Sequence, residues 1–233
     1  MNYRKLCIYM CVCIMHICYW CMLENKFLDI YDGYNLLFAI VGTHGGYGFF
    51  LTISTVFMLI HLILVSNNLS PFSIHLLSRK NRVNALNICY KKLVIGSVVY
   101  AFLYEVVQVI FIWLLIDFNL LIEIHFFKVM FMHFVAIALI FMFGASIYLL
   151  FYIKINNKYM AILISVAINV SIAYFTNTKI LYGGIEVIDK MTRLQAINII
   201  EWLIYQIINI LIIVMIYAVT EEVYKKRDIY DRF

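Results

Sequence analysis

Six long runs of apolar residues constrain this chain more than any other feature of its sequence. Each run has at least 17 residues, and a helix needs about 20 apolar residues to cross roughly 30 Å of hydrocarbon. Strands of a membrane β-barrel would instead alternate polar and apolar residues over about 10 positions. The runs therefore predict an all-α polytopic membrane protein with six transmembrane helices, at residues 6–23, 47–66, 93–116, 126–153, 159–175 and 199–220.

The composition excludes the soluble classes of protein. Of the 233 residues, 65% are hydrophobic and only 13% are charged, and the mean hydropathy is +0.94. A folded globule of this size leaves much of its surface exposed, so a surface this apolar must face lipid. A soluble enzyme and a soluble nucleic-acid-binding protein are both excluded.

The lysines and arginines indicate which side of the membrane each connection occupies. With the N-terminus in the cytoplasm, the inner segments hold 13 of the 18 Lys and Arg residues and the outer segments hold 5. Basic residues are retained on the cytoplasmic side during insertion. The sequence therefore predicts that both termini are cytoplasmic. The net charge of +5 follows from this topology and requires no nucleic-acid partner.

The connections between the runs are too short for a soluble domain, so we expect one transmembrane domain over residues 1–233. The longest inner connection, 67–92, contains the dipeptide Ser70-Pro71. This pair is a good helix start, because Ser is a common N-cap and Pro is favoured at the first helical position. One interpretation of the segment is a charged stop that sets the topology. The other is a docking surface for a cytoplasmic protein.

In the number and orientation of its predicted spans, the chain resembles the membrane subunit of a type-2 ABC transporter. Its nearest likeness in style is to the small permeases of bacteriocin and lantibiotic export or immunity systems. The resemblance implies a cytoplasmic ABC ATPase that hydrolyses ATP, a second permease copy or homologous subunit as dimer partner, and no cofactor bound directly. It implies an outer segment that partly re-enters the bilayer near Gly183-Gly184. It also implies ATPase-coupling residues in 67–92 and in the turn 154–158, namely Ser78, Arg79, Arg82, Lys91, Lys92, Lys154 and Lys158.

Polar residues inside the apolar runs form a candidate substrate path. An ionisable group at bilayer depth costs about 2.5–3.5 kcal/mol on insertion scales, so it normally faces protein or a wet cavity. Glu105 is such a group, and Gln108 shares its helix face because residues three apart are neighbours. One interpretation is a polar lining for translocation; the other is hydrogen bonding between helices. The residues concerned are Glu105, Gln108, Asn169, Gln206 and Asn209.

Two motifs raise enzymatic alternatives, although neither identifies catalytic residues. Cys18 and Cys21 form a C-x-x-C pair of the kind used by a membrane thiol oxidoreductase, but free cysteines also pack as small hydrophobes. Glu221-Glu222 resembles half of the paired-glutamate motif of membrane CAAX-type proteases, but no His follows it in the sequence. No spacing typical of a metal site is present.

The function expected from the sequence is a permease subunit that moves a peptide or an amphipathic, lipid-like substrate with a separate ATPase. The alternatives are a stand-alone membrane enzyme, either a peptidase or a thiol oxidoreductase, and an accessory or immunity protein that works without an ATPase. The abundance of Ile, Asn, Lys and Tyr is typical of an AT-rich genome. We therefore expect the chain to lie, in contact with membrane lipids, in the cell membrane of a low-GC Gram-positive bacterium.

Overall fold

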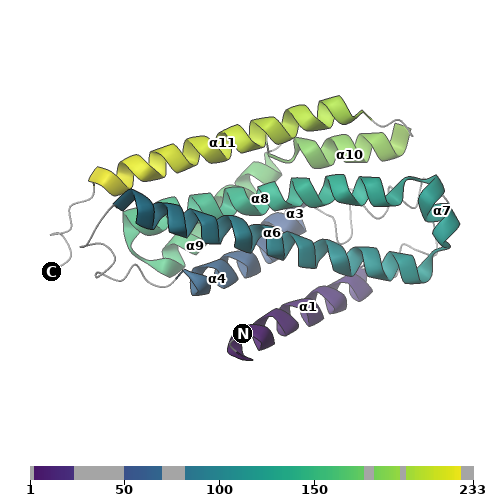
Figure 1. Cartoon of the computed structure of the whole chain (residues 1–233), viewed down its shortest axis with the longest axis horizontal. Coiled ribbons are helices and arrows are strands. Elements are labelled where there is room, and N and C mark those ends of the chain that lie inside the picture. The colour runs from purple at the N-terminus through teal and green to yellow at the C-terminus, as the bar shows by residue number, and fades with distance from the viewer. Residues whose placement is uncertain (1–2, 24–49, 70–81, 176–180, 195–197, 227–233) are drawn as a thin grey trace.

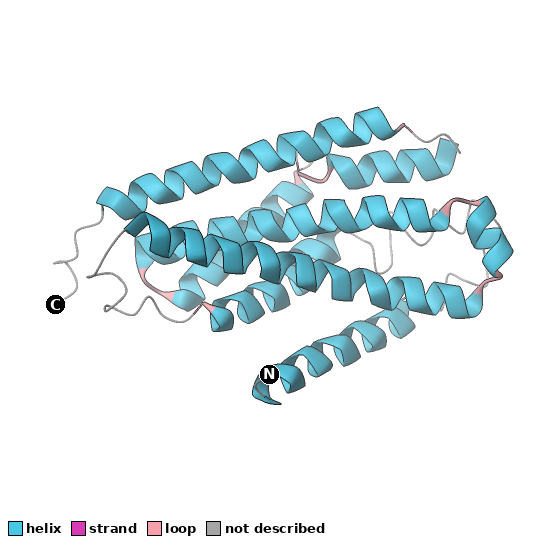
Figure 2. Cartoon of the chain, in the orientation of Figure 1, coloured by secondary structure: helices cyan, strands magenta, loops and turns pink. Residues whose placement is uncertain are grey.

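Helices make up every element in the part of the chain that the structure describes. The computed structural model describes residues 3–23, 50–69, 82–175, 181–194 and 198–226, and these ranges contain no strand (Figure 2). In chain order the helices are α1 (Tyr3–Leu23), α3 (Phe50–Thr52), the π-helix η1 (Ile53–Phe57), α4 (Met58–Asn68), α6 (Arg82–Leu115), α7 (Phe118–Glu123), α8 (Phe126–Ile155), α9 (Lys158–Tyr174), α10 (Gly183–Leu194) and α11 (Ile199–Lys226).

Three of these helices, α6, α8 and α11, are long and apolar enough to cross a membrane. This supports the prediction of an α-helical membrane protein. The other predicted runs overlap shorter apolar helices, at Ile8–Met22, Ile53–Asn67 and Lys158–Tyr174. The main difference from the predicted boundaries is in α6, which begins at Arg82, well before the predicted run at 93–116. Residues 82–92 therefore continue the same helix that forms the run.

The bundle is organised around α8. Figure 1 shows α6, α8 and α11 running side by side along the long axis, and α8 contacts α4, α6, α7, α9, α10 and α11. In the most apolar 18-residue window of α8, 72% of the residues are buried, against 39% in α6 and 22% in α11. The core of the molecule therefore lies around α8, while α11 lies at the edge.

Two asparagines make the tight turn between α8 and α9. Asn156 takes a left-handed conformation, with φ 60°, at the C-terminus of α8, and asparagine tolerates this conformation better than most residues. The Asn157 side chain then accepts hydrogen bonds from the amides of Tyr159 and Met160, at 3.0 and 3.2 Å. It therefore caps the N-terminus of α9. The sequence predicts this short turn, and the structure gives its cause.

The second predicted run contains a turn of π-helix, η1, between α3 and α4. The hydroxyls of Ser54 and Thr55 both donate to the carbonyl oxygen of Leu51, at 3.0 and 2.6 Å. Such bonds compete with the regular helical ladder, and π-turns are often found at functional sites. The last residue of η1, Phe57, is fully buried, and its ring stacks on the ring of His16 of α1.

Candidate functional site

A stripe of buried polar residues follows one face of α6. Ser97, Tyr100, Tyr104 and Gln108 are three or four residues apart and so lie on the same side of the helix, and Glu105 lies beside Tyr104. The faces beside this stripe carry exposed apolar residues such as Val98, Phe102 and Ile110. The buried polar members are Ser97, Tyr100, Tyr104, Glu105 and Gln108.

Glu105 in this stripe pairs with His133 of α8. The Nδ1 atom of His133 lies 2.5 Å from Oε1 of Glu105. Both residues are enclosed by the bundle, with Glu105 4% exposed and His133 0% exposed. The structure therefore places Glu105 toward protein, as expected for an ionisable group at membrane depth. Gln108, on the same face of α6, is also fully buried.

Two more buried histidines extend this polar region through the bundle. The His16 ring of α1 stacks on Phe57, with centroids 4.8 Å apart, and contacts Tyr104 at 5.7 Å. His16 also contacts Tyr100 at 5.5 Å, and Tyr100 contacts His61 of α4 at 5.1 Å. At the far end of this series, Nε2 of His61 lies 3.2 Å from Oγ of Ser97. Together with His133 of α8, side chains from α1, η1, α4 and α6 thus form one central cluster.

Sequence reasoning from carboxylates and amides missed the three histidines of this cluster. His16, His61 and His133 lie in three different apolar runs and are each 0% exposed. A histidine inside an apolar run is itself a signal, because any ionisable group at that depth needs a polar neighbour. Their convergence on α6 depends on helix packing, which the run lengths do not determine.

A second polar contact joins α11 to the start of α10. The Asn209 side-chain amide donates to the carbonyl oxygen of Leu181 at 3.1 Å, and Leu181 has a left-handed backbone with φ 69°. That conformation is strained for a bulky residue and persists only when its surroundings enforce it. Gln206, one turn earlier on α11, lies against Gly184, where an added Cβ would be 2.1 Å from the amide nitrogen of Gln206.

The position of α10 follows from this contact. Figure 1 shows α10 lying along the N-terminal half of α11, and it packs against both α11 and α8. Asn209 is ten residues into α11, or about 15 Å from its start at 1.5 Å per residue. The chain therefore begins α10 deep beside α11 and then runs back toward the beginning of α11.

Asn169 lies in a third place, between α8 and α9. Its amide donates to the Ser165 carbonyl at 2.8 Å, and the Ser165 hydroxyl donates to the Gly144 carbonyl at 2.7 Å. The first of these bonds lies within α9, and the second joins α9 to α8 at Gly144. The five residues predicted to line a path thus occupy three helix pairs: α6–α8, α8–α9 and α10–α11.

The predicted coupling residues that the structure describes, Lys91, Lys92, Lys154 and Lys158, lie toward the end of the bundle where α6 and α9 begin. Ser78, Arg79 and the side chain of Arg82 lie outside the described residues. Of the remaining lysines, Lys91, Lys92 and Lys154 are exposed. Lys158 is half-buried, and its Nζ donates to Oδ1 of Asn67 at 2.6 Å. This bond joins the α8–α9 turn to the end of α4, next to the segment 70–81.

The residues that suggest the enzymatic alternatives do not come together into a catalytic site within the described ranges. Cys18 and Cys21 are both exposed and free. Glu221 and Glu222 each lie 2.5 Å from a lysine one turn on, Lys225 and Lys226. Lys226 holds the pKa of the exposed Glu222 carboxyl below its ordinary value. Within the described residues, no group of three or more His, Cys, Asp or Glu side chains is arranged to hold a metal ion.

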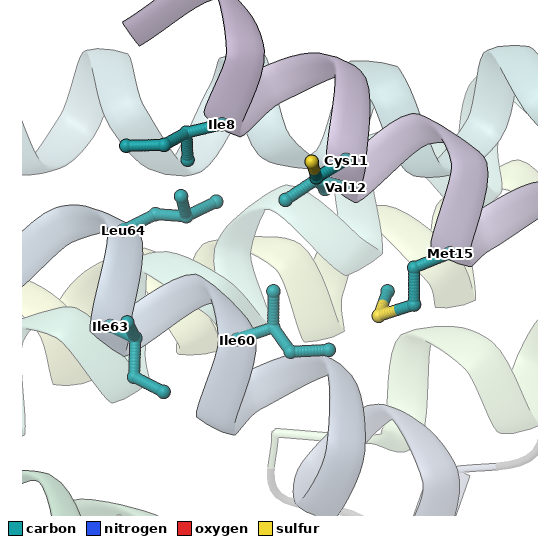
Figure 3. Close-up of a pocket in the computed structure, with 7 residues that line it drawn as sticks. All are labelled: Ile8, Cys11, Val12, Met15, Ile60, Ile63 and Leu64. Carbon is teal, nitrogen blue, oxygen red and sulfur yellow. The ribbon is translucent and has the colours of Figure 1, made fainter. Parts of the chain in front are cut away.

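An apolar pocket of about 590 Å³ lies between α1 and α4 (Figure 3). The residues that line it carry no charge, so it suits an apolar chain better than a polar reactant. They are Ile8, Cys11, Val12, Met15, Ile60, Ile63 and Leu64.

Comparison with known proteins gives no relative: no family model, curated protein or solved structure matches this chain.

Proposed function

We propose that this chain is the permease subunit of an ABC transporter, with six membrane spans and both termini in the cytoplasm. A separate ATPase subunit hydrolyses ATP, and a second permease copy or homologous subunit completes the transporter. The cargo is a peptide or an amphipathic, lipid-like molecule. The three long apolar helices and the buried polar residues between helices support a role inside the membrane.

The observation that carries this proposal is the bond between Lys158 and Asn67. An ATPase-driven permease needs its cytoplasmic connections close together, so that one partner can act on several helices at once. Asn67 is near the end of α4, just before the basic segment 70–81, and Lys158 begins α9. Asn67 is the first residue of the connection 67–92 and Lys158 is the last residue of the turn 154–158, so this bond links the two connections that the resemblance assigns to ATPase coupling.

A further contact at the same end supports this arrangement. The Tyr217 hydroxyl of α11 donates to Oδ1 of Asn87 on α6, and the ring of Tyr217 packs edge-on against Tyr90 at 4.4 Å. Hydrogen bonds near this end of the bundle thus join α4 to α9 and α6 to α11. A force applied at segment 67–92 would reach α6 directly, because residues 82–92 are part of that helix.

The arrangement of α10 supports the re-entrant outer segment that the resemblance implies. This helix starts about 15 Å along α11 and returns toward the outer end of the topology proposed. A buried turn at that depth requires its backbone groups to find partners. The Leu181 carbonyl has such a partner in Asn209.

Partner capture tests the ATPase assignment. The tagged chain would be purified in mild detergent from its own host's membranes and assayed for co-purifying MgATP hydrolysis. We expect hydrolysis with the wild type and its loss in the double variant Arg79→Glu, Arg82→Glu. Lys190→Glu is the matched control, because this half-exposed lysine is on α10 at the opposite end of the bundle. Wild-type protein without ATPase, or a double variant that retains it, would contradict the proposal.

Reporter fusions test the topology independently of any partner. Fusions after residues 30, 80, 120, 156, 196 and 230 should report outside, inside, outside, inside, outside and inside, because 13 of the 18 basic residues then lie in the cytoplasm. An external signal at position 230 would overturn the six-span arrangement even if an ATPase co-purified.

A further inference from the structure

The Glu105–His133 pair has the features of a site that exchanges protons. Its two side chains come from different helices and approach to 2.5 Å inside the bundle. A neutral imidazole and a carboxylate at this distance share one hydrogen, with the N–H donating to the carboxylate oxygen. The pair then carries one negative charge, which is costly to bury without further compensation.

Each partner also has a second polar atom at which a proton can bind. Among the described residues, Oε2 of Glu105 and Nε2 of His133 have no hydrogen-bond partner. A proton added at either atom leaves the Nδ1–Oε1 contact in place and makes the pair neutral overall. The gain is one proton and one positive charge, and no other bond changes.

Other titratable side chains lie along α6 between the pair and the N-terminal part of this helix. The Tyr104 ring lies 6.4 Å from His133, and the ring contacts with His16 and Tyr100 lead on to His61. From Glu105 to Ser97 is eight residues, or about 12 Å along the helix axis. A cluster with this many ionisable rings is expensive in an apolar bundle, and such chains typically mark proton relays in membrane proteins.

The charged groups on the neighbouring elements lie mostly toward the helix ends, away from the pair. Asp189 of α10 is the other buried carboxyl among the described residues. The titratable side chains that the structure describes on the elements packed against α6 and α8 are Tyr9, Cys11, Cys13, His16, Cys18, Tyr19 and Cys21 of α1, His61 of α4, Glu123 of α7, Lys158, Tyr159 and Tyr174 of α9, Glu186, Asp189 and Lys190 of α10, and Glu201, Tyr205, Tyr217, Glu221, Glu222, Tyr224, Lys225 and Lys226 of α11.

We propose that Glu105 and His133 form an exchangeable proton-binding site inside the helix bundle. Its ligand is a single proton, which binds to the pair and neutralises its charge. Because the pair joins α6 to α8, binding and release of the proton change the electrostatic energy of the central helix contact. This inference goes beyond the proposed function and does not depend on the identity of the ATPase or the cargo.

Infrared difference spectroscopy of the purified protein between about pH 8 and pH 5, where histidine switches occur, tests the site. The spectra report the C=O stretch of a protonated carboxyl and the ring modes of histidine. We expect a pH-dependent band in the wild type that disappears in Glu105→Gln, which keeps the shape and removes the ionisation. In His133→Gln the remaining carboxyl band should move to a different midpoint pH.

Asp189→Asn is the matched control, since it removes the other buried carboxyl and should leave the band unchanged. If His133→Gln does not fold, Glu105→Gln still decides the question, because a histidine band that depends on Glu105 identifies the pair. A wild-type spectrum without pH-dependent bands would overturn the proposal, and so would identical bands in Glu105→Gln. Because the assay needs no ATPase, loss of the permease assignment would leave its result unaffected.

Discussion

The helices α8 and α11 are almost equal in length and apolarity, yet they occupy opposite kinds of place in the bundle. They have 30 and 28 residues, and their most apolar 18-residue windows have mean hydropathies of 2.5 and 2.3, but 72% of that window is buried in α8 and only 22% in α11. Apolarity therefore shows that both helices suit a membrane. It does not show which one the other helices surround.

Small residues account for the central position of α8. Ala136, Ala138, Gly144 and Ala145 are distributed along this helix, and small residues let helix backbones approach closely where lipid provides no hydrophobic driving force. At Gly144 the approach is close enough for the carbonyl to accept a hydrogen bond from Ser165 of α9.

The helix α11 instead buries a single narrow stripe. Its buried residues recur mostly every three or four positions and are polar or aromatic in most cases. The rest of the helix presents exposed Ile, Leu, Val and Met. The buried residues are Trp202, Gln206, Asn209, Ile213, Thr220 and Tyr224. The comparison teaches that polar residues indicate which face of an apolar helix is inward, even when the helix lies at the edge.

The largest effect on stability is expected at the contact between His133 of α8 and Glu105 of α6. His133→Leu leaves Glu105 buried without its partner, and breaking a buried pair in this way costs about 3–5 kcal/mol. We expect a correspondingly large loss of stability, measured by denaturant unfolding in detergent. The double variant Glu105→Leu, His133→Leu should recover most of the loss, because it removes the stranded charge. Equal losses in the single and double variants would show that the pair is not coupled.

A smaller effect is expected where α10 approaches α11. At Gly183 an added Cβ would be 2.5 Å from a ring carbon of Tyr205, and a rigid ring cannot give way easily. We expect Gly183→Ala to cost about 1–3 kcal/mol, as overpacking typically does. Gly144→Ala on α8 is the matched comparison, because its added Cβ meets the flexible end of Met58. A larger loss of stability in Gly144→Ala than in Gly183→Ala would show that the helices pack more tightly at Gly144 of α8 than at Gly183 of α10.

Much of this arrangement can be read from the sequence, and the remainder depends on contacts between distant residues. Run lengths predict where apolar helices occur, and the cost of burying charge predicts that Glu105 points inward. The partner of Glu105 is 28 residues away on another helix, so spacing within one helix identifies Gln108 and misses His133. The sequence does not predict the early start of α6, because Lys91 and Lys92 are typical of the boundary of a span, although they lie on the exposed side of a continuing helix.

The third effect on stability is expected in the buried stripe of α11, at Asn209. Asn209→Leu removes the hydrogen bond to the Leu181 carbonyl, and hydrogen bonds between membrane helices contribute about 0.6 kcal/mol on average. The strained backbone at Leu181 also loses its support, so we expect a loss of about 1–2 kcal/mol. Protection of the α10 amides from hydrogen exchange should fall more than that of α8. Uniform loss of protection would show that Asn209 supports the whole bundle and has no specific role at α10.

The smallest effect is expected on the outward face of α11. Ile207 is 56% exposed and Ile137 of α8 is 0% exposed, so the two residues test the comparison with the same side chain. Truncating Ile137 to Ala opens a cavity that the surrounding helices cannot fill, and such changes typically cost about 2–5 kcal/mol. At Ile207 lipid or detergent chains move into the space that the side chain leaves, so Ile207→Ala should change stability by less than about 0.5 kcal/mol. Thermal unfolding in detergent and in lipid nanodiscs measures both variants. A loss at Ile207 as large as that at Ile137 would mean that protein covers this face in the assembled molecule, and α11 would then be a buried helix of the complex.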